Sequence, residues 1–321
     1  MCNKHTPADL KALQNYPLPS KILRTQTRIM EFYEHYGGKV YIAFSGGLDS
    51  TILLDLARRM YPDIPAVFCD TGLEYPENRD FVKRVENVTW IKPKVPFPKI
   101  LETHGFPIIS KDVAKTIKYA KRGSKWAIDR LNGANMDGTQ SEFKQRYKKW
   151  KFLLEAPFEI SDYCCNALKL SPIRQFVRDT GLHAIVGTVA DESFQRKQAW
   201  LKAGCNSLTK NGKSQPLAFW TRQDILQYHK KYCKLGYSSI YGDIADNLGG
   251  QITFLEFSGI GRKLHTTGAD RTGCMFCMFG VHLEKEPNRF QRMKQSHPQL
   301  YEYCINKLGC GPVLDYIGVK Y

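Results

Sequence analysis

Long hydrophobic runs are missing from this sequence of 321 residues. No apolar stretch approaches the roughly 18–20 residues of a membrane span, and no hydrophobic segment follows Met1 as it would in a secretory signal. Acidic residues are scarce as well, because 31 Asp and Glu face 47 Lys and Arg and leave a net charge of +16. We therefore expect a cytoplasmic protein without a membrane partner. The excess positive charge favours polyanionic partners such as nucleic acid or phosphate-rich ligands.

Internal repeats and low-complexity segments are also absent. Hydrophobic residues make up 42% and aromatic residues 12% of the chain, which supplies a proper core and excludes a disordered protein. The ten cysteines would suit a disulfide framework in a short secreted chain. In a large chain of cytosolic type they indicate metal, cluster or redox chemistry instead.

Short β-branched or aromatic runs alternate with segments whose apolar residues recur at helical spacing. The pattern predicts strands at 40–44, 64–69, 88–91 and 183–186. It predicts helices at 49–58, 76–85, 171–180 and 221–232. Strands that alternate with helices are typical of a doubly wound parallel sheet, so the expected fold class is α/β. Ligands of such sheets bind beyond the carboxyl ends of the strands.

Three parts of the chain are expected from these patterns. Residues 1–37 are predicted to form an N-terminal helical extension and 38–240 the α/β domain, with 241–321 as a C-terminal helical region that carries a Cys-x-x-Cys motif. A basic helical insertion is expected at about 111–155. Within it, 111–151 holds twelve Lys and Arg against four Asp and Glu.

Aromatic residues lie among the charges of this basic segment, at Trp126, Tyr147 and Trp150. Phosphate contacts combined with base stacking are typical of nucleic-acid binding, so the segment is a candidate nucleic-acid interface. The alternative is a solvated basic face whose aromatic residues pack inward.

A glycine-rich loop joins the first predicted strand to the helix that follows it. Paired glycines let the backbone approach a phosphate closely, and the N–H groups at the helix start point at an anion. Hydroxyl groups of the loop can donate to phosphate oxygens, and Asp49 is predicted to hold the loop or a Mg²⁺ ion. The spaced Gly-Lys-Ser/Thr of a Walker A loop is missing. The loop residues are Ser45, Gly46, Gly47, Leu48, Asp49, Ser50 and Thr51.

The Ser-Gly-Gly-Leu-Asp-Ser sequence at 45–50 resembles the PP-loop of the ATP pyrophosphatase (adenine nucleotide α-hydrolase-like) superfamily. Three further segments resemble, in order, the phosphoadenylyl-sulfate (PAPS) reductase family. They are Asp-Thr-Gly-Leu-Glu-Tyr-Pro-Glu at 70–77, Gly-Thr-Val-Ala-Asp-Glu-Ser with Arg196 at 187–196, and Gln-Pro-Leu-Ala-Phe-Trp-Thr-Arg-Gln-Asp-Ile at 215–225. The resemblance extends over residues 38–280.

The resemblance implies a site for an adenine nucleotide. It places Ser45, Gly46, Gly47, Asp49 and Ser50 on a phosphate or sulfate, Asp70 and Gly72 at the border of the nucleotide, and Gly187, Asp191, Glu192 and Arg196 across the cleft. Thr51 extends the phosphate loop, and the catalytic candidates are Asp49, Asp70 and Arg196.

Three other residues qualify this implied site. Thr188 stands where the family often has an arginine, so one anion contact is missing. Trp220 and Asp224 belong to the family-like segment, but a packed aromatic side chain and a helix cap are the favoured explanation of them.

Four cysteines have the spacing of a metal centre. Cys274 and Cys277 form a Cys-x-x-Cys motif, and the adjacent pair Cys164 and Cys165 completes a set of four thiolates. The set resembles the [4Fe-4S] site of the assimilatory adenylyl-sulfate reductases, as do Lys169 and Pro172 after the Cys-Cys pair. A zinc ion, free thiols and disulfides are the alternatives. The long separation of the two pairs indicates an insertion at 242–270.

The family's mobile C-terminal Glu-Cys-Gly-Ile/Leu-His segment is absent, and Cys310 in an apolar setting is its nearest counterpart. We expect an enzyme that carries a [4Fe-4S] cluster and binds ATP, adenylyl-sulfate or PAPS, in sulfonucleotide reduction or sulfur transfer. A thioredoxin-like reductant or a sulfur donor is the expected protein partner. The alternatives are ATP-dependent adenylation with thiolation or phosphorothioation of nucleic acid, and a non-enzymatic cluster-containing nucleic-acid binder.

Overall fold

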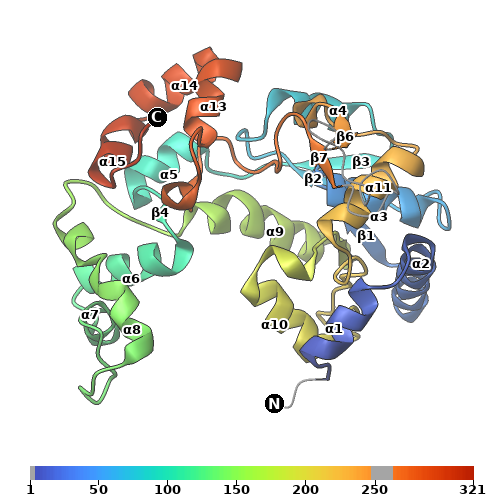
Figure 1. The fold of residues 1–321 in the computed structure, drawn as a ribbon, viewed down its shortest axis with the longest axis horizontal. Coiled ribbons are helices and arrows are strands. Elements are labelled where there is room, and N and C mark those ends of the chain that lie inside the picture. Colours follow the sequence, from blue (N-terminus) through green and yellow to red (C-terminus); the bar gives the residue numbers. More distant parts are fainter. Residues whose placement is uncertain (1–3, 247–262) are drawn as a thin grey trace, which may run out of the picture. The chain divides into compact units, whose positions relative to one another are not determined.

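A parallel sheet forms the centre of the first of two compact units (Figure 1). The computed structural model describes residues 4–246 and 263–321. The described residues of the first unit lie within Met1–Asp70, Glu74–Ile91 and Ile173–Thr272, and those of the second within Thr71–Leu73, Lys92–Pro172 and Gly273–Tyr321. The basic segment and the Cys-Cys and Cys-x-x-Cys motifs therefore fold within the same unit.

The strand order of the central sheet is β3-β2-β1-β5, and all neighbouring strands are parallel. Ile42 of β1 pairs in register with Ala66 on one side and Ile185 on the other. The four strands predicted from the sequence are confirmed, and the parallel pairing of β1 with the distant β5 requires a crossover connection. They are β1 (Val40–Ala43), β2 (Ala66–Cys69), β3 (Val88–Ile91) and β5 (His183–Val186).

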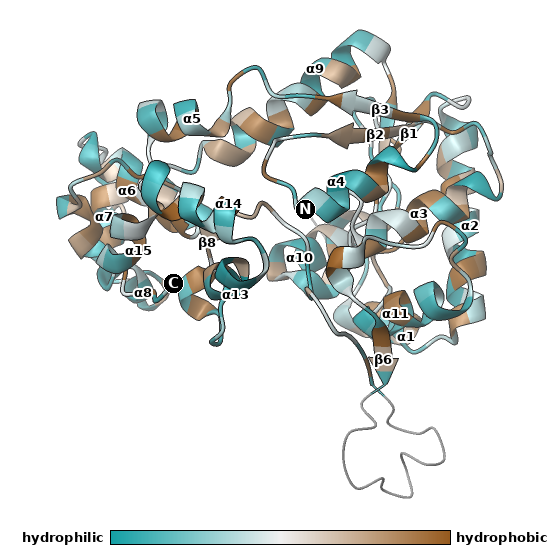
Figure 2. Ribbon diagram, turned by 90° about the horizontal axis from the view of Figure 1, so that it is seen from above, coloured by the Kyte–Doolittle hydropathy of each residue, from teal (hydrophilic) through white to brown (hydrophobic). Residues whose placement is uncertain are grey.

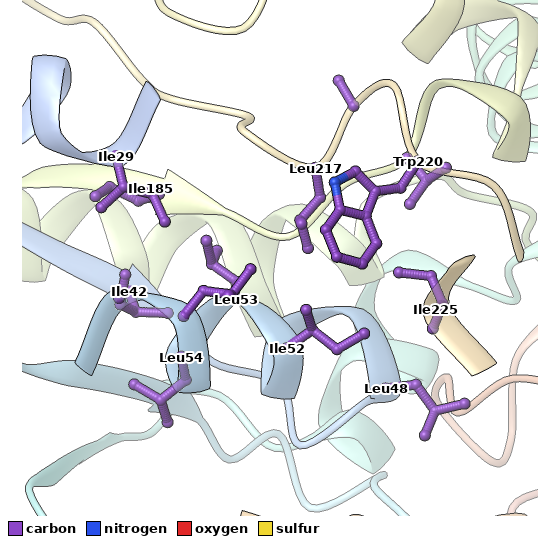
Figure 3. Packing of buried hydrophobic residues seen from close by; sticks show 14 of the residues in the cluster. Ile29, Ile42, Leu48, Ile52, Leu53, Leu54, Ile185, Leu217, Trp220 and Ile225 are labelled. Atoms are coloured by element: carbon purple, nitrogen blue, oxygen red, sulfur yellow. The ribbon is translucent and has the colours of Figure 1, made fainter. Parts of the chain in front are cut away.

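Helices pack on both faces of this sheet. Successive residues of a strand point to opposite faces, so Tyr41 and Ile42 contact different layers. Ile42 belongs to the hydrophobic cluster that includes residues of α2 (Leu18–His35) and α3 (Leu48–Arg58), as Figure 3 shows. Tyr41 packs edge-to-face on Phe176 of α9 (Ser171–Thr180), with ring centroids 5.2 Å apart. The fold is therefore the doubly wound α/β arrangement predicted from the sequence.

The predicted insertion at 242–270 includes an antiparallel pair formed by β6 and β7, while residues 247–262 lie outside the described part of the chain. The other helices and strands of the first unit are α1 (Pro7–Gln14), α4 (Pro76–Lys83), α10 (Phe194–Ala203), α11 (Arg222–Lys231), β6 (Ile244–Asp246) and β7 (Leu264–Thr266).

The second unit is mainly helical, and its strands β4 (Ile108–Ile109) and β8 (Met278–Phe279) form a short parallel pair. The predicted basic helices are confirmed as α6 (Lys111–Lys121), α7 (Lys125–Leu131) and α8 (Glu142–Lys148), and Figure 2 shows hydrophilic and hydrophobic residues in each. The remaining helices are α5 (Phe97–His104), α13 (Arg289–Ser296), α14 (Pro298–Glu302) and α15 (Cys310–Tyr316). Among the helices that the structure describes, none is both long and apolar enough to cross a membrane.

A buried ion pair joins α2 to the start of α11. Lys21 Nζ lies 2.5 Å from the Asp224 carboxylate, and the two side chains are 2% and 11% exposed. Asp224 also completes a capping box with Thr221, as the sequence predicted. Trp220 is fully buried and donates from Nε1 to the Thr25 hydroxyl at 2.9 Å. Trp220 is therefore a packed core residue and Asp224 a helix-capping residue, as the structural explanation of the two residues predicted.

Lys21→Met should lower the free energy of unfolding by about 3–5 kcal/mol, because it leaves the Asp224 carboxylate buried without its cation. Urea denaturation measures the change. Arg28→Met on the same helix is the matched control, since its 2.6 Å pair with Glu31 is partly exposed and should contribute less than about 1 kcal/mol. Equal losses in the two variants would contradict a special role for the buried pair.

Candidate functional site

The PP-loop runs from the end of β1 into α3, and helix α4 fixes its shape. Gly46 has a φ of +73°, which glycine adopts readily. A Cβ at Gly46 would lie 2.7 Å from Val82 Cγ2 and 2.9 Å from the Asn78 amide. Asn78 also donates to the Ser45 carbonyl at 2.8 Å. Only glycine therefore fits at Gly46, because of both its φ angle and its contact with α4.

The hydroxyl groups of the PP-loop bond largely within the loop. Ser50 Oγ accepts from the Ser45 N–H at 3.1 Å and donates to the Gly47 carbonyl at 3.0 Å. Thr51 is fully buried and donates to the same carbonyl at 3.0 Å. Ser45 is exposed, with its Oγ 3.0 Å from Ser50 Oγ. Ser50 and Thr51 thus shape the loop, while Ser45 is the exposed residue of the three.

Gly187 brings the end of β5 against the start of α3. A Cβ at Gly187 would lie 3.0 Å from both the Asp49 carbonyl oxygen and the Ser50 nitrogen. The next residue, Thr188, donates its hydroxyl to Gln215 at 2.7 Å. The structure therefore places Gly187 directly at the PP-loop.

Three predicted site residues follow Gly187: Asp191 and Glu192 lie in a short 3₁₀ turn, Ala190–Glu192, and Arg196 lies in the first turn of α10. Asp191 is exposed, and Glu192 pairs with Arg196 one helical turn later. Ser193 caps the helix and accepts from the Arg196 N–H at 3.2 Å. This cap fixes the backbone from which the Arg196 side chain extends.

Asp49 lies within electrostatic range of three arginines, Arg222, Arg196 and Arg271. Burial raises the pKa of Asp49, and the arginines oppose that rise. Burial likewise lowers the pKa of Arg196, which Asp49 opposes and Arg271 reinforces. The predicted catalytic residues Asp49 and Arg196 are thus brought together from distant parts of the sequence.

The sequence patterns assign no role to two hydroxyls that also lie at the PP-loop. Tyr241 OH accepts from the Leu48 N–H at 3.4 Å and lies 2.8 Å from Thr272 Oγ1. A Cβ at Gly47 would lie 3.3 Å from Thr272 Oγ1 and 3.4 Å from Tyr241 OH. No motif marks these residues. For Thr272, the one sequence feature that could have indicated a role is its place in the polar Arg271-Thr272 pair just before the Cys-x-x-Cys motif.

Asp70 and Gly72 belong to different compact units. Asp70 is buried after β2, and its carboxylate accepts from Arg79 at 2.8 Å. Gly72 is exposed with a φ of +76°. Their roles at a nucleotide stay predictions.

The four cysteines of the predicted metal centre all belong to the second unit. Cys164 and Cys165 immediately precede a π-helical turn, Asn166–Leu170, and their Sγ atoms lie 4.0 Å apart. The Cys277 N–H donates to the Cys274 carbonyl at 3.1 Å. Cys164 interacts electrostatically with both Cys277 and Cys274. The two cysteine pairs therefore belong to the same unit and interact electrostatically, and a shared metal group stays a prediction.

Cationic side chains act electrostatically on Cys165 and Cys277. The contact with Cys164 and the charges of Lys111 and Lys169 bring the pKa of Cys165 to about 6, while the same thiol contact raises the pKa of Cys164. Burial raises the pKa of Cys277, which Arg289 opposes. Arg289 also donates to the Cys277 carbonyl at 2.9 Å.

Four thiols with cations nearby have the chemistry of a site for a thiolate-bound group of negative charge, and binding of such a group stays a prediction. Four thiols are the ligand set of both a [4Fe-4S] cluster and a structural zinc ion, and Lys111, Lys169 and Arg289 supply compensating charge. Across residues 4–246 and 263–321, no three His, Cys, Asp or Glu side chains are grouped so as to hold a single metal ion.

Cys310, the counterpart of the family's mobile cysteine, is fully buried in the second unit. Its free thiol is hydrogen-bonded to the thiol of Cys304, which is also buried, and this contact raises the pKa of Cys304. The thiol of Cys310 thus lies inside the packed C-terminal helices rather than on a mobile tail.

The basic segment uses several of its charges within the second unit. Lys118 pairs with Asp162 at 3.0 Å, and Arg130 forms two 3.0 Å bonds to Asp112. Tyr147 is buried, with the Arg130 guanidinium 4.1 Å from its ring centroid. A nucleic-acid partner stays a prediction that depends on the exposed residues of the segment, among them Lys115, Arg122, Lys125, Lys148 and Lys149.

A Ser-Gly-Gly-Leu-Asp-Ser loop between a parallel strand and a helix, at the carboxyl edge of a doubly wound sheet, defines a PP-loop α/β protein. The family model described as "Phosphoadenosine phosphosulfate reductase domain" matches residues 39–125 and 110–278. The chain therefore belongs to the phosphoadenosine phosphosulfate reductase family.

Several curated proteins are similar to this chain. An adenosine 5'-phosphosulfate reductase of Staphylococcus haemolyticus is 24% identical over 268 residues, which are 79% of this chain and 85% of that protein. An uncharacterized protein of Methanocaldococcus jannaschii is 23% identical over 287 residues, which are 87% of this chain, so the chain spans about half (51%) of that relative's length. The crystal structure of phosphoadenylyl-sulfate (PAPS) reductase from Candida auris, a phosphate complex, aligns with a TM-score of 0.39 and 14% identity over 76% of this chain and 97% of that one.

His229 connects α11 to the start of α3. Its Nε2 lies 3.0 Å from the Leu48 carbonyl, to which the neutral ring donates, and its Nδ1 is buried without a hydrogen-bond partner among the described residues. Burial lowers the pKa of His229 to about 4. The folded protein therefore holds this ring in its neutral form.

Acid should destabilise the fold through His229. His229 takes up a proton at about pH 6.5 in the unfolded chain and at about pH 4 in the folded chain. The free energy of unfolding should therefore fall as the pH drops between these values, by up to about 3 kcal/mol. His229→Gln keeps a donor for Leu48 but cannot titrate, so its unfolding free energy should vary less over this range. His35→Gln on the exposed side of α2 is the control. Equal pH slopes for wild type and His229→Gln in urea titrations would contradict the assignment.

Proposed function

We propose that the protein is an enzyme that binds an adenine nucleotide at its PP-loop and acts in sulfonucleotide reduction or sulfur transfer. The observations that carry this proposal are the close backbone contacts at Gly46 and Gly187 and the electrostatic interaction of three arginines with Asp49, where α3 begins. The N-terminal end of a helix favours an anion at the same place. The relatives named adenosine 5'-phosphosulfate reductase support adenylyl-sulfate as the nucleotide, with PAPS and ATP as the other candidates.

In this proposal the residues of the loop bind and orient the anionic end of the nucleotide. The backbone at Gly46 and Gly47 approaches a phosphate or sulfate, and Ser45 donates its hydroxyl. Arg196 neutralises the group through its forked guanidinium. Asp49 holds the loop or orients a Mg²⁺ ion, which would neutralise the charge of bound phosphates.

We include a [4Fe-4S] cluster held by Cys164, Cys165, Cys274 and Cys277 in the proposal. The mutual interaction of these thiols and the nearby cations Lys111, Lys169 and Arg289 support it. When bound, such a cluster supplies redox capacity and negative charge beside its thiolates. Zinc is the alternative for the same four ligands.

A second candidate is an ATP-dependent enzyme that adenylates an acceptor, after which a sulfur donor displaces AMP. The burial of Cys310 favours it, because sulfonucleotide reduction needs an accessible thiolate and a thioredoxin-like reductant. Nucleic acid is the acceptor that the exposed lysines of the basic segment would suit.

Product analysis separates the two candidates. Anaerobically prepared protein is incubated separately with adenylyl-sulfate, PAPS and ATP. Sulfite release would support reduction, whereas pyrophosphate release that rises on addition of RNA or DNA would support adenylation. Asp49→Asn should slow whichever reaction occurs by about tenfold or more, because an amide cannot replace the carboxylate in orienting the loop or Mg²⁺. Arg28→Gln is the control, and failure to bind or convert any of the three nucleotides would overturn the proposal.

Iron analysis tests the cluster separately from turnover. Replacement of any one of the four cysteines by serine should remove the bound iron. It should also remove the broad absorbance at about 400 nm that thiolate-bound iron–sulfur centres show. Cys233→Ser is the matched control, since this half-buried cysteine lies in the first unit. Stoichiometric zinc without iron in anaerobically prepared protein would contradict the cluster.

A further inference from the structure

Three arginines act electrostatically on Asp49, the one carboxylate of the PP-loop. Arg196 is also paired with Glu192, whereas Arg222 and Arg271 are exposed. Arg196 and Arg271 repel each other. Repulsion between guanidinium groups is unfavourable, and a further anion bound beside them would relieve it.

Two of these arginines lie in the first turn of a helix, where the helix dipole is unfavourable for a cation. Arg222 is the first residue of α11, and Arg196 lies in the first turn of α10. The N-terminal end of a helix carries partial positive charge, so acidic residues are the stabilising ones there. Asp224 supplies an acid in the first turn of α11, whereas the first turn of α10 has none. Both helix starts would gain from an anion bound beside them.

The segment that carries Arg271 is fixed against the loop by specific bonds. Arg222 donates to the Asp270 carbonyl at 2.8 Å, which uses one of its five N–H donors. Thr272 Oγ1 contacts Tyr241 OH at 2.8 Å, and Tyr241 is buried against the Leu48 N–H. The Thr272 hydroxyl therefore has a defined position 3.3 Å from the site of a Cβ on Gly47.

We propose that Arg222, Arg271 and Thr272 form a second anion subsite beside the PP-loop, which takes a second phosphate or sulfate group of the bound nucleotide. This inference rests on the proposed function and extends it, because the site then recognises two charged groups of the nucleotide instead of one. The subsite supplies the anion contact that Thr188 cannot make, since its hydroxyl is bonded to Gln215. The preferred ligands then carry two adjacent tetrahedral oxyanions, as in adenylyl-sulfate, ADP or pyrophosphate, and AMP binds through one.

Calorimetric titration of the full-length protein with AMP, ADP, adenylyl-sulfate and pyrophosphate tests the subsite. The double variant Arg222→Gln/Arg271→Gln should bind pyrophosphate and adenylyl-sulfate about 30-fold or more weakly, because each lost charge-assisted bond corresponds to about tenfold in affinity. Its affinity for AMP should fall by less than about threefold. Thr272→Val should weaken the two-anion ligands by a smaller factor, of about five.

The matched control is Lys83→Gln/Arg84→Gln, which removes the same charge from exposed positions at the end of α4. An equal loss of pyrophosphate affinity in this control would overturn the subsite in favour of long-range attraction. Arg271→Lys keeps the charge without the planar fork and should recover part of the affinity.

Two outcomes separate the subsite from the proposed function. Wild-type affinity for pyrophosphate and adenylyl-sulfate in a folded Arg222→Gln/Arg271→Gln variant would remove the subsite and leave the proposed function standing. A wild-type protein that binds neither AMP nor any two-anion ligand would overturn the proposed function itself. Thermal unfolding of each variant confirms that the binding changes are not losses of fold.

Discussion

The close backbone contacts of the PP-loop determine how the first unit is arranged around it. Gly187 lets β5 end against the backbone of Asp49 and Ser50, and Gly46 lets α4 pack against the opposite part of the loop. A single Cβ at either glycine would meet atoms at 3.0 Å or less. With its backbone held from both sides, the loop can direct the hydroxyls of Ser50 and Thr51 inward. The start of α3 then keeps its orientation toward an anion without rearranging.

The same packing explains why the arginines converge. Arg196 follows β5 through the short connection that contains Gly187, and Arg222 begins the helix that Lys21 and Asp224 tie to α2. His229, two turns along that helix, contacts the Leu48 carbonyl. A neutral His229 is the form compatible with this position, because a second buried proton would add charge next to a helix start already facing several cations. Fold stability and site electrostatics therefore depend on shared contacts.

The sequence predicted those features that local patterns encode. Apolar periodicity located the four sheet strands and the helices between them, and the capping box at Thr221 marked the start of α11. Motif spacing identified the PP-loop and the two cysteine pairs. Arg271, Tyr241 and Thr272 were not predicted, because only the tertiary fold brings them to the loop and no periodicity distinguishes them from surface residues. The inward bonds of Ser50 and Thr51 likewise depend on the turn geometry, and the Lys118–Asp162 pair depends on packing between segments far apart in sequence.

Both candidate reactions leave an anion at the PP-loop, which relates the charge of the site to its chemistry. Reduction of adenylyl-sulfate releases AMP, and adenylation by ATP releases pyrophosphate. Guanidinium groups that are already in place stabilise negative charge as it develops on either leaving group. The anion subsite proposed at Arg222, Arg271 and Thr272 would therefore suit both reactions. Formation of sulfite consumes two electrons, whereas adenylation consumes none. The availability of a reducing thiol, and not the anion-binding residues at the PP-loop, therefore distinguishes one reaction from the other.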